Sequence, residues 1–393
     1  MAARAARSVG QGALVAAFAL YLGAMGWSAP AIGATLGAAL AFGSMLTLVV
    51  GPWSDRLGRR RFLLGYELLQ AGAALAALCT AWPAALVVGA TLGGFGRGGG
   101  GSAGPFAPLE QAWLAQALPA RRRGTVFSAN AAIGLLGMAL GALLAGGVAW
   151  LRPALGPVHA YRPLFGLSFL GSMATFALLW GAEEVPPGSG QAPASAETAH
   201  ATRRTENRAL LKLMGVNVLN GMGIGMVAPL MAYWLALRFR HGPGSIGPAL
   251  AGAFVLGALG SVAAIWLTRR HGLMRPVVVM RGLGILVLVA VPLSPVFALA
   301  VGLYAVRAGL NQGTAGVRQA LVAGLTGDAR RGLAATVHNV SIQIPRALGP
   351  FVAGVLLHAG MLRAPFFIAA ALQAAYLLLY ARFFGAYATG GAD

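Results

Sequence analysis

Long apolar runs, separated by short polar or charged stretches, set the pattern of this 393-residue chain. Dividing the sequence at charges, prolines and turn residues gives twelve apolar segments, near residues 9–28, 31–53, 61–80, 84–117, 123–150, 163–181, 209–237, 245–268, 275–291, 295–325, 332–358 and 364–384. A helix needs about 20 apolar residues to cross the roughly 30 Å hydrocarbon core of a bilayer. Most segments reach that length, and the mean hydropathy of the chain is +0.73. The pattern predicts a polytopic membrane protein.

The segments are expected to be helices rather than the strands of a membrane barrel. Only these two structures satisfy all backbone hydrogen bonds in lipid, and runs such as AALVVGATL lack the alternation of barrel strands. The predicted fold class is therefore all-α, with twelve transmembrane helices. The fourth and tenth segments are longer than a span needs, so each should extend beyond the hydrocarbon or bend. Pro105 and Pro108 are candidate bends in the fourth.

One stretch with almost no large apolar side chains, AEEVPPGSGQAPASAETAHATRRTEN at 182–207, divides the segments into six and six. A stretch of this composition cannot span a membrane or pack a core, so it is interpreted as a cytoplasmic linker. Residues 1–181 and 208–393 are then predicted to form two six-helix bundles.

The two predicted bundles repeat each other in sequence. FGSMLTLVVGPWSDRLGRRRFLLG, from Phe42, overlies LGALGSVAAIWLTRRHGLMRPVVV, from Leu256, at an offset of 214 residues. Further along, an offset of 208 residues places Gly141 on Gly349 and Gly146 on Gly354. Repeated halves are typical of secondary transporters, in which two bundles move about a site near the membrane midplane.

The formal net charge of +20 would ordinarily suggest a nucleic-acid partner. Basic residues of membrane proteins gather in cytoplasmic loops, however, so topology alone explains the excess. With the N-terminus inside, nineteen of the 29 basic residues, Arg4 and Arg7 among them, fall on the cytoplasmic side and five on the outer side. We therefore expect both termini in the cytoplasm, a bacterial-type inner membrane location, and no nucleic-acid partner.

Residues 1–30 also resemble a signal peptide, since basic residues precede an apolar stretch that ends near small residues at Ser28 and Ala29. The apolar stretch continues to about Trp27, and another apolar segment follows at once. We interpret residues 9–28 as a retained first helix.

The sequence offers little for catalysis, a metal or a cofactor. Cys79 is the single cysteine, and the six histidines have no ligand spacing. No set of nucleophile, base and oxyanion donors is present, and no phosphate loop ending in GKS or GKT. GFGRGG at 94–99 fits a dinucleotide pattern but lies in an apolar segment, so it is interpreted as helix packing or a flexible break. We expect no enzyme activity, no cofactor and no metal.

GPWSDRLGRRR, at 51–61, resembles the signature loop between the second and third helices of the major facilitator superfamily. The matching residues are Gly51, Asp55, Arg56, Gly58, Arg59 and Arg60. RRRG at 121–124 and DARRG at 328–332 look like the matching loops after helices four and ten, and GPFVAG at 349–354 looks like a glycine-proline motif of exporters. The resemblance covers essentially the whole chain and implies a twelve-helix transporter.

Two positions depart from the family pattern. The glycine-proline motif normally lies on helix five, where Ala142 stands in the proline position, which weakens the inference to drug export. The second copy of the signature loop has Arg269 where the first has Asp55. We interpret the first loop as a gate, in which Gly51 allows close helix approach, Gly58 permits a tight turn and Asp55 accepts hydrogen bonds. The alternative is that its arginines only set the orientation in the membrane.

Ionisable residues at membrane depth are costly, so each is a functional candidate. The rise of a helix places Arg97, Arg307 and Arg346 about 18–22 Å from their helix ends, near the middle of the bilayer. Three arginines without an acid favour an anionic or acceptor-rich substrate. Uncharged contacts to that substrate are expected from Asn217, Asn220, Asn311 and Gln343. The alternative for each arginine is a structural bond to backbone carbonyls.

Embedded charges nearer the cytoplasm have opposite signs in the two halves. Glu67 overlies Arg281 at offset 214, and Glu110 overlies Arg318 at offset 208. We interpret these four residues as forming, directly or through neighbours, an electrostatic latch between the halves that breaks when the cavity opens inward. Pairing within one bundle is the alternative. If protons are coupled to transport, Glu67 and Glu110 are the membrane-embedded carboxylates that carry them.

The sequence therefore predicts a monomeric secondary transporter in a lipid bilayer that moves a small organic solute by alternating access. Family resemblance adds proton-coupled export. The three midplane arginines favour an alternative, uptake or exchange of an organic anion. A different class, a lipid flippase or scramblase on the same scaffold, requires a lateral opening.

Overall fold

A computed structural model describes residues 1–97, 120–182, 199–271, 274–323 and 331–384, together with Glu110 and Trp113. Within these ranges every regular element is a helix, as predicted. The first half contains α1 (Ala2–Ala24), α2 (Ala29–Leu57), α3 (Arg59–Cys79), α4 (Pro83–Gly93), α6 (Ala120–Gly146), α7 (Val148–His159) and α8 (Arg162–Trp180). The second contains α9 (Ala199–Val227), α10 (Met231–Phe239), α11 (Pro243–His271), α12 (Met274–Ala290), the 3-10 helix η2 (Val291–Leu293), α13 (Phe297–Ala323), α14 (Arg331–His358) and α15 (Ala364–Phe384).

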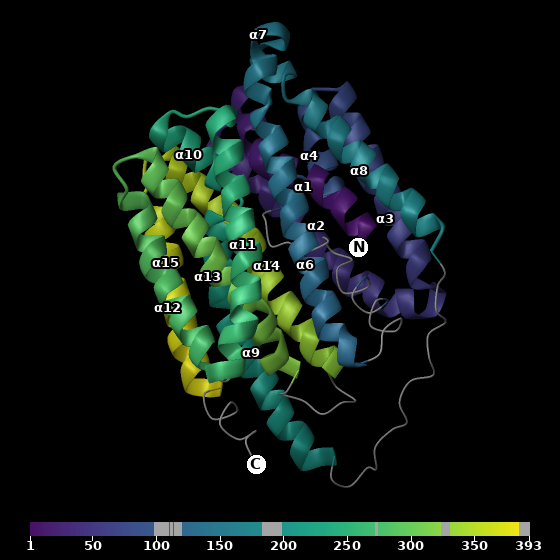
Figure 1. Cartoon of the computed structure of the whole chain (residues 1–393), viewed down its shortest axis with the longest axis vertical. Helices are drawn as coiled ribbons and strands as arrows, with labels where there is room; N and C mark the ends of the chain where they lie inside the picture. The colour runs from purple at the N-terminus through teal and green to yellow at the C-terminus, as the bar shows by residue number, and fades with distance from the viewer. Residues whose placement is uncertain are drawn as a thin grey trace.

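The helices form two groups, which we call the N bundle (α1–α8) and the C bundle (α9–α15) (Figure 1). In the N bundle α1 packs against α6 and α8, while α3 packs against α4 and α8. In the C bundle α9 packs against α14 and α15, and α13 against α11 and α12. Contacts between the bundles run mainly through α2 with α14 and through α6 with α11.

Ten helices in the described ranges are long and apolar enough to cross a membrane. The remaining two predicted segments contain α4 and α13. The fourth segment is interrupted, because α4 ends at Gly93. The candidate bends at Pro105 and Pro108 lie outside the described residues. The seventh segment is divided into α9 and α10, and α9 begins at Ala199, inside the predicted linker. The short helix α7 extends beyond the fifth segment.

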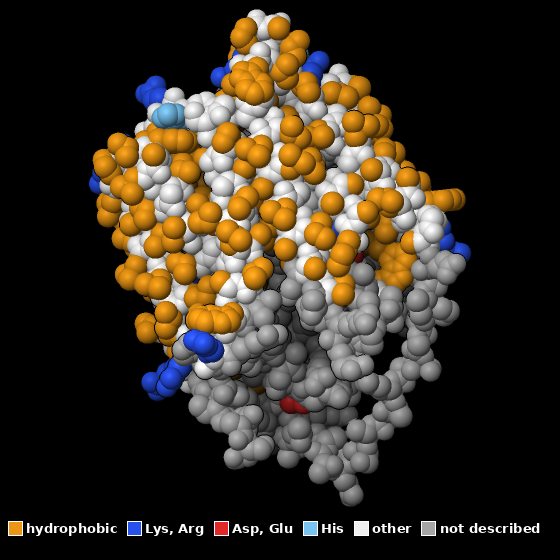
Figure 2. Space-filling view, in the orientation of Figure 1, with side chains coloured by type: hydrophobic (Ala, Val, Ile, Leu, Met, Phe, Trp, Pro, Cys, Tyr) orange, Lys and Arg blue, Asp and Glu red, His pale blue; other side chains and the backbone are white. Residues whose placement is uncertain are grey.

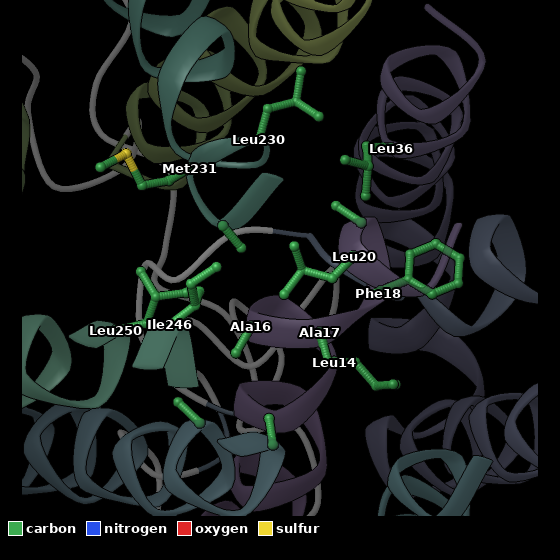
Figure 3. Close-up of a cluster of buried hydrophobic side chains, with 14 of the residues drawn as sticks. Leu14, Ala16, Ala17, Phe18, Leu20, Leu36, Leu230, Met231, Ile246 and Leu250 are labelled. Carbon is green, nitrogen blue, oxygen red and sulfur yellow. The ribbon is translucent and has the colours of Figure 1, made fainter. Parts of the chain in front are cut away.

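Apolar side chains are spread over the described part of the face seen in Figure 2, as a lipid environment requires. Trp150, Leu286 and Leu378 are among the large apolar residues that point outward. The buried core continues from one bundle to the other (Figure 3), since α1, α2, α10 and α11 contribute to a single cluster. Its members include Leu14, Leu20, Leu36, Met231, Ile246 and Leu250.

The bundles touch most closely at the end of the molecule that carries α7. A methyl group on Gly33 of α2 would overlap the Pro350 carbonyl of α14. One on Gly247 of α11 would lie 2.5 Å from the Ala142 carbonyl oxygen of α6. These contacts are related by the repeat, because Gly33 and Gly247 differ by 214 positions and Ala142 and Pro350 by 208. In both contacts the atom that faces the glycine is a backbone carbonyl oxygen, which alanine and proline share. Ala142 therefore makes the same contact as Pro350, although it is not a proline.

Candidate functional site

A cavity of about 60 Å³ is lined by polar and apolar residues of both bundles. Its polar lining includes Gln11, Ser44, Gln70, Arg97, Gln343 and Arg346. Arg346 connects the bundles, since its Nη1 donates to Gln343 Oε1 at 3.3 Å and its Nη2 to the Arg97 carbonyl oxygen at 3.4 Å. Three of the predicted substrate residues, Arg97, Gln343 and Arg346, are therefore brought together in one cavity.

A break in the chain after α4 positions Arg97. Gly94 and Gly96 both have a φ of +68°, a left-handed conformation that glycine adopts without strain. A methyl group on Gly94 would overlap the Arg97 guanidinium, and one on Gly43 would lie 2.6 Å from Arg97 Nη1. Arg97 Nη2 donates to the Tyr66 hydroxyl at 3.0 Å. Of the two interpretations of GFGRGG, a break in the helix fits the described part of the motif, Gly94–Arg97, where the glycines make room for the arginine.

Arg97 and Arg346, two of the arginines that line the cavity, retain hydrogen-bond donors without partners. Nη1 of Arg97 and Nε of Arg346 are buried and have no hydrogen-bond partner. No Asp or Glu lines the cavity among the residues that the structure describes. The cavity is thus positively charged and rich in donors, a setting that favours carboxylate or phosphate groups.

The carboxylates form a second cluster inside the N bundle. Arg7 of α1 donates to Glu67 Oε1 at 2.6 Å and to Glu110 Oε2 at 2.7 Å. Arg4 Nη1 lies 3.8 Å from the same Glu110 oxygen, and Asn130 Nδ2 donates to Glu110 Oε1 at 3.4 Å. Arg7 also lines the central cavity, and together with Glu110 it lines a second, largely apolar cavity of about 390 Å³. We call Arg4, Arg7, Glu67 and Glu110 the N-bundle ion cluster.

This cluster corrects two sequence-based predictions. Glu67 and Glu110 pair within one bundle, so a direct latch to Arg281 and Arg318 is not what the structure shows. Arg4 and Arg7 belong to α1, where each side chain is only 4% exposed, and not to a cytoplasmic stretch before the first helix. Removing them from the cytoplasmic count leaves seventeen basic residues against five.

Two arginines and three amides of the C bundle do not line the central cavity. Arg307 Nη2 lies 3.5 Å from Gln373 Oε1, and Arg281 Nη1 lies 3.4 Å from Asn311 Oδ1. Asn217 Nδ2 donates to Ser341 Oγ at 2.8 Å and lies 3.1 Å from His338 Nδ1. The other amide is Asn220, which is completely buried. The structure thus separates Arg307, Asn217, Asn220 and Asn311 from the cavity in which they were expected.

The loop between α2 and α3 contains the predicted gate. Gly58, between the two helices, has a φ of +92°, which confirms the tight turn. Arg60 donates to the Trp180 carbonyl of α8, and its guanidinium carbon lies 5.8 Å from the centre of the Trp180 ring. Arg59 begins α3. The side chains of Asp55 and Arg56, and the surroundings of Gly51, lie outside the described residues, so the gate stays a prediction.

Arg7 is the functional candidate that sequence reasoning missed. Its position near the N-terminus matched the positive-inside pattern, which hid its burial. A usable indication exists, because Arg4 and Arg7 are three residues apart and therefore share one face of a helix. Two embedded glutamates need nearby cations, and these two arginines are a matched pair for them.

The sequence model of the Major Facilitator Superfamily matches residues 1–215 and again residues 213–390. No curated protein sequence matches this chain. Among solved structures, a D-xylose-proton symporter gives a TM-score of 0.73 at 15% identity, over 96% of this chain and 95% of that one. A bacterial homologue of the iron transporter ferroportin gives 0.72 at 16% identity, over 97% and 96%. A nucleoside transporter gives 0.70 at 12% identity, over 98% of both chains. At these identities the likeness shows the fold.

Proposed function

This chain belongs to the Major Facilitator Superfamily and is a secondary transporter, and we propose that it carries a small organic anion bound between Arg97 and Arg346. As a member of a carrier family it is not an enzyme. One observation supports the anion: both arginines line a shared cavity, keep unpaired N–H groups, and have no carboxylate beside them among the described lining residues. An anionic group removes the cost of this uncompensated charge.

Proton coupling is the second part of the proposal. Arg7 is shared by Glu67 and Glu110 and lies between two cavities, the central one and the one that Glu110 lines. Protonation of Glu110 would leave Arg7 with a single carboxylate and make its guanidinium available to an anion in the central cavity. Export, the direction favoured by the family resemblance, is retained. The seventeen-to-five distribution of basic residues favours cytoplasmic termini in an inner membrane.

Lipid transport is a second candidate function, favoured by the apolar cavity of about 390 Å³. Leu63, Trp113 and Leu178 line this cavity together with Arg7 and Glu110, an arrangement that suits an acyl chain with a charged head group. In this alternative the lipid reaches the N-bundle ion cluster, and the central cavity is not the principal site.

Uptake into proteoliposomes with an imposed pH gradient tests the proposal. A panel of small mono- and dicarboxylates should accumulate or exchange, and Arg346→Gln should reduce transport at least tenfold, since a buried charged hydrogen bond is worth about 1.5–3 kcal/mol. Arg363→Gln makes the same change at an exposed site and should leave transport unchanged. Substrate-driven movement of protons supports coupling.

Three results would overturn parts of the proposal. Transport of neutral solutes alone, or unchanged transport by Arg346→Gln, contradicts the anion site. Anion transport without proton movement contradicts coupling. Movement of fluorescent lipid between leaflets, with no response to any small solute, favours the lipid alternative.

A further inference from the structure

Glycine contacts of α1 with α6, and of α9 with α14, show which residues of α1 and α9 occupy equivalent positions in the two bundles. A methyl group on Gly12 would overlap the Met138 backbone, and one on Gly225 would overlap the Arg346 backbone. Similarly, a methyl carbon added to Gly141 would lie 2.7 Å from the Ala13 backbone nitrogen, and one added to Gly349 would lie 2.5 Å from the Met226 backbone nitrogen. Met138 and Arg346 are 208 positions apart, as are Gly141 and Gly349. Both pairs of contacts therefore place α1 on α9 at an offset of 213 residues.

At this offset Arg7 corresponds to Asn220. The N-bundle arrangement is an arginine between two glutamates, Arg7 with Glu67 and Glu110. The equivalent C-bundle residues are Asn220, Arg281 and Arg318. Each acid of the first bundle is replaced by an arginine in the second, and the central arginine is replaced by a neutral amide.

The C-bundle set is deeply buried and poorly paired. Arg281 is 2% exposed, its Nε has no partner, and its guanidinium carbon lies 5.5 Å from the centre of the Tyr376 ring. Arg318 is 9% exposed, and its Nε lies 3.4 Å from the Thr314 carbonyl oxygen. Asn220 is 0% exposed, and neither atom of its amide has a partner.

Charge is also uncompensated in this set. The repeat places Arg281 and Arg318 at the positions of Glu67 and Glu110, which both reach Arg7 in the N bundle, so two like charges are expected side by side. Neither Arg281 nor Arg318 forms an ion pair with any carboxylate in the described part of the chain. Two buried cations without a counter-ion are strongly unfavourable at membrane depth, whereas a bound anion with hydrogen-bond donors around it removes most of that cost.

We propose that a small monovalent anion, of the size of chloride or a formate-like carboxylate, binds in the C bundle beside Arg281 and Arg318, with the Asn220 amide as a further donor. The charges are thereby inverted between the bundles: an anion between two arginines stands where the N bundle has an arginine between two carboxylates. This site uses none of the residues that line the central cavity, so it is separate from the proposed transport site.

Thermal unfolding of the purified full chain in detergent tests the site. Sodium chloride should raise the unfolding midpoint in a saturable way relative to sodium methanesulfonate at equal ionic strength, because a ligand bound only to the folded state stabilises it. Asn220→Asp, which has nearly the same shape, supplies a fixed carboxylate and should abolish the chloride dependence. Asn220→Ala removes the amide without adding charge and should retain most of it.

Further variants separate this site from the transport cavity. Arg281→Gln and Arg318→Gln should each weaken the chloride effect, whereas Arg346→Gln should leave it intact even if it abolishes transport. Stabilisation by sodium formate at lower concentration than chloride supports the site and assigns it to carboxylates. Equal wild-type midpoints in all three salts, or full chloride dependence in Asn220→Asp, would overturn the proposal. The paired Asn220 variants remain decisive if the arginine variants do not fold.

Discussion

The N and C bundles share their packing but differ in their buried charge. One glycine contact between the bundles is found in both halves of the repeat, as Gly33 on Pro350 and as Gly247 on Ala142. The buried charged positions follow the offsets of the same repeat and yet hold opposite residues, with two glutamates in one bundle and two arginines in the other. The repeat therefore preserves geometry while each bundle solves its charge balance separately.

The glycine positions and the buried charged positions differ because they place different demands on the side chain. Backbone atoms in direct contact leave no space for a side chain, so only glycine fits at a crossing, whichever bundle it belongs to. A buried charge requires only a nearby partner of opposite sign, and a side chain or a bound ion satisfies that need equally. The N bundle uses Arg7 as its internal partner, whereas the described residues of the C bundle include no carboxylate paired with Arg281 or Arg318.

Among the changes that test this difference between the bundles, removing Arg7 is expected to have the largest effect on stability. Arg7→Gln leaves Glu67 buried without its cation, and among the described residues it leaves Glu110 with the more distant Arg4 and the Asn130 amide. Breaking a buried ion pair from one side costs about 3–5 kcal/mol, so the folded protein should be recovered poorly or unfold at much lower temperature. Thermal unfolding in detergent measures the change.

Arg97→Gln is the matched control for this loss. It also removes an arginine, but one with no carboxylate partner in the described structure, so its unfolding midpoint should stay near that of the wild type. Equal destabilisation by the two variants would show that the N-bundle ion cluster has no special role in stability.

Exchanging charges between the bundles should also have a large effect, and the structure predicts no rescue. In Glu110→Arg combined with Arg318→Glu, the new arginine would face Arg7 and Arg4, because the partners of residue 110 lie on α1. Transport in proteoliposomes should be as poor in the double variant as in Glu110→Arg alone. Recovery of transport would instead support the latch between bundles that the sequence suggested.

The charge clusters show where sequence reasoning ends. Helical rise predicts depth, and it placed both Arg97 and Arg307 near the midplane. Depth does not predict which way a side chain points, since rotation about the helix axis depends on packing with neighbours. Arg97 lines the cavity because the helix breaks at Gly94, whereas Arg307 meets Gln373 inside the C bundle. The apolar segments and the repeat were predictable because both depend on composition and spacing alone.

The ends of α9 illustrate the same limit for boundaries. Polarity indicated a linker up to residue 207, and polarity does exclude a membrane span there. Residues 199–207 contain no glycine or proline, however, so nothing in them prevents a helix from starting early. Polar composition therefore indicates where a linker lies but does not predict the first turn of α9.

Filling one glycine contact should have an intermediate effect. Gly33→Leu forces α2 away from the Pro350 carbonyl, and overpacking of this kind costs about 1–3 kcal/mol. The arrangement closed at the α7 end should lose about 5–150-fold in population, with a matching fall in transport rate. Spin labels on the α7 ends of α2 and α14 would report the longer distance.

Gly72→Leu makes the same change on α3, where nothing lies within 4 Å of the added carbon. It should preserve both transport and the label distances. Gly247→Leu, the repeat partner of Gly33→Leu, should behave like it. A normal transport rate in both interface variants would show that closure at the α7 end does not depend on these crossings.

The smallest effect is expected at a residue that only the N bundle has. Arg60 holds the end of α8 through the Trp180 carbonyl and ring, while its repeat position is Met274. An exposed contact of this kind contributes about 0.5–1 kcal/mol, so Arg60→Gln should lower the unfolding midpoint slightly and leave transport nearly unchanged. The exposed neighbour Arg61→Gln should change neither. The contrary result would be that Arg60→Gln stops transport while the unfolding midpoint stays at the wild-type value. A contact that only anchors α8 would change the midpoint when it is lost, so this result would place Arg60 in the gate that the signature loop implies.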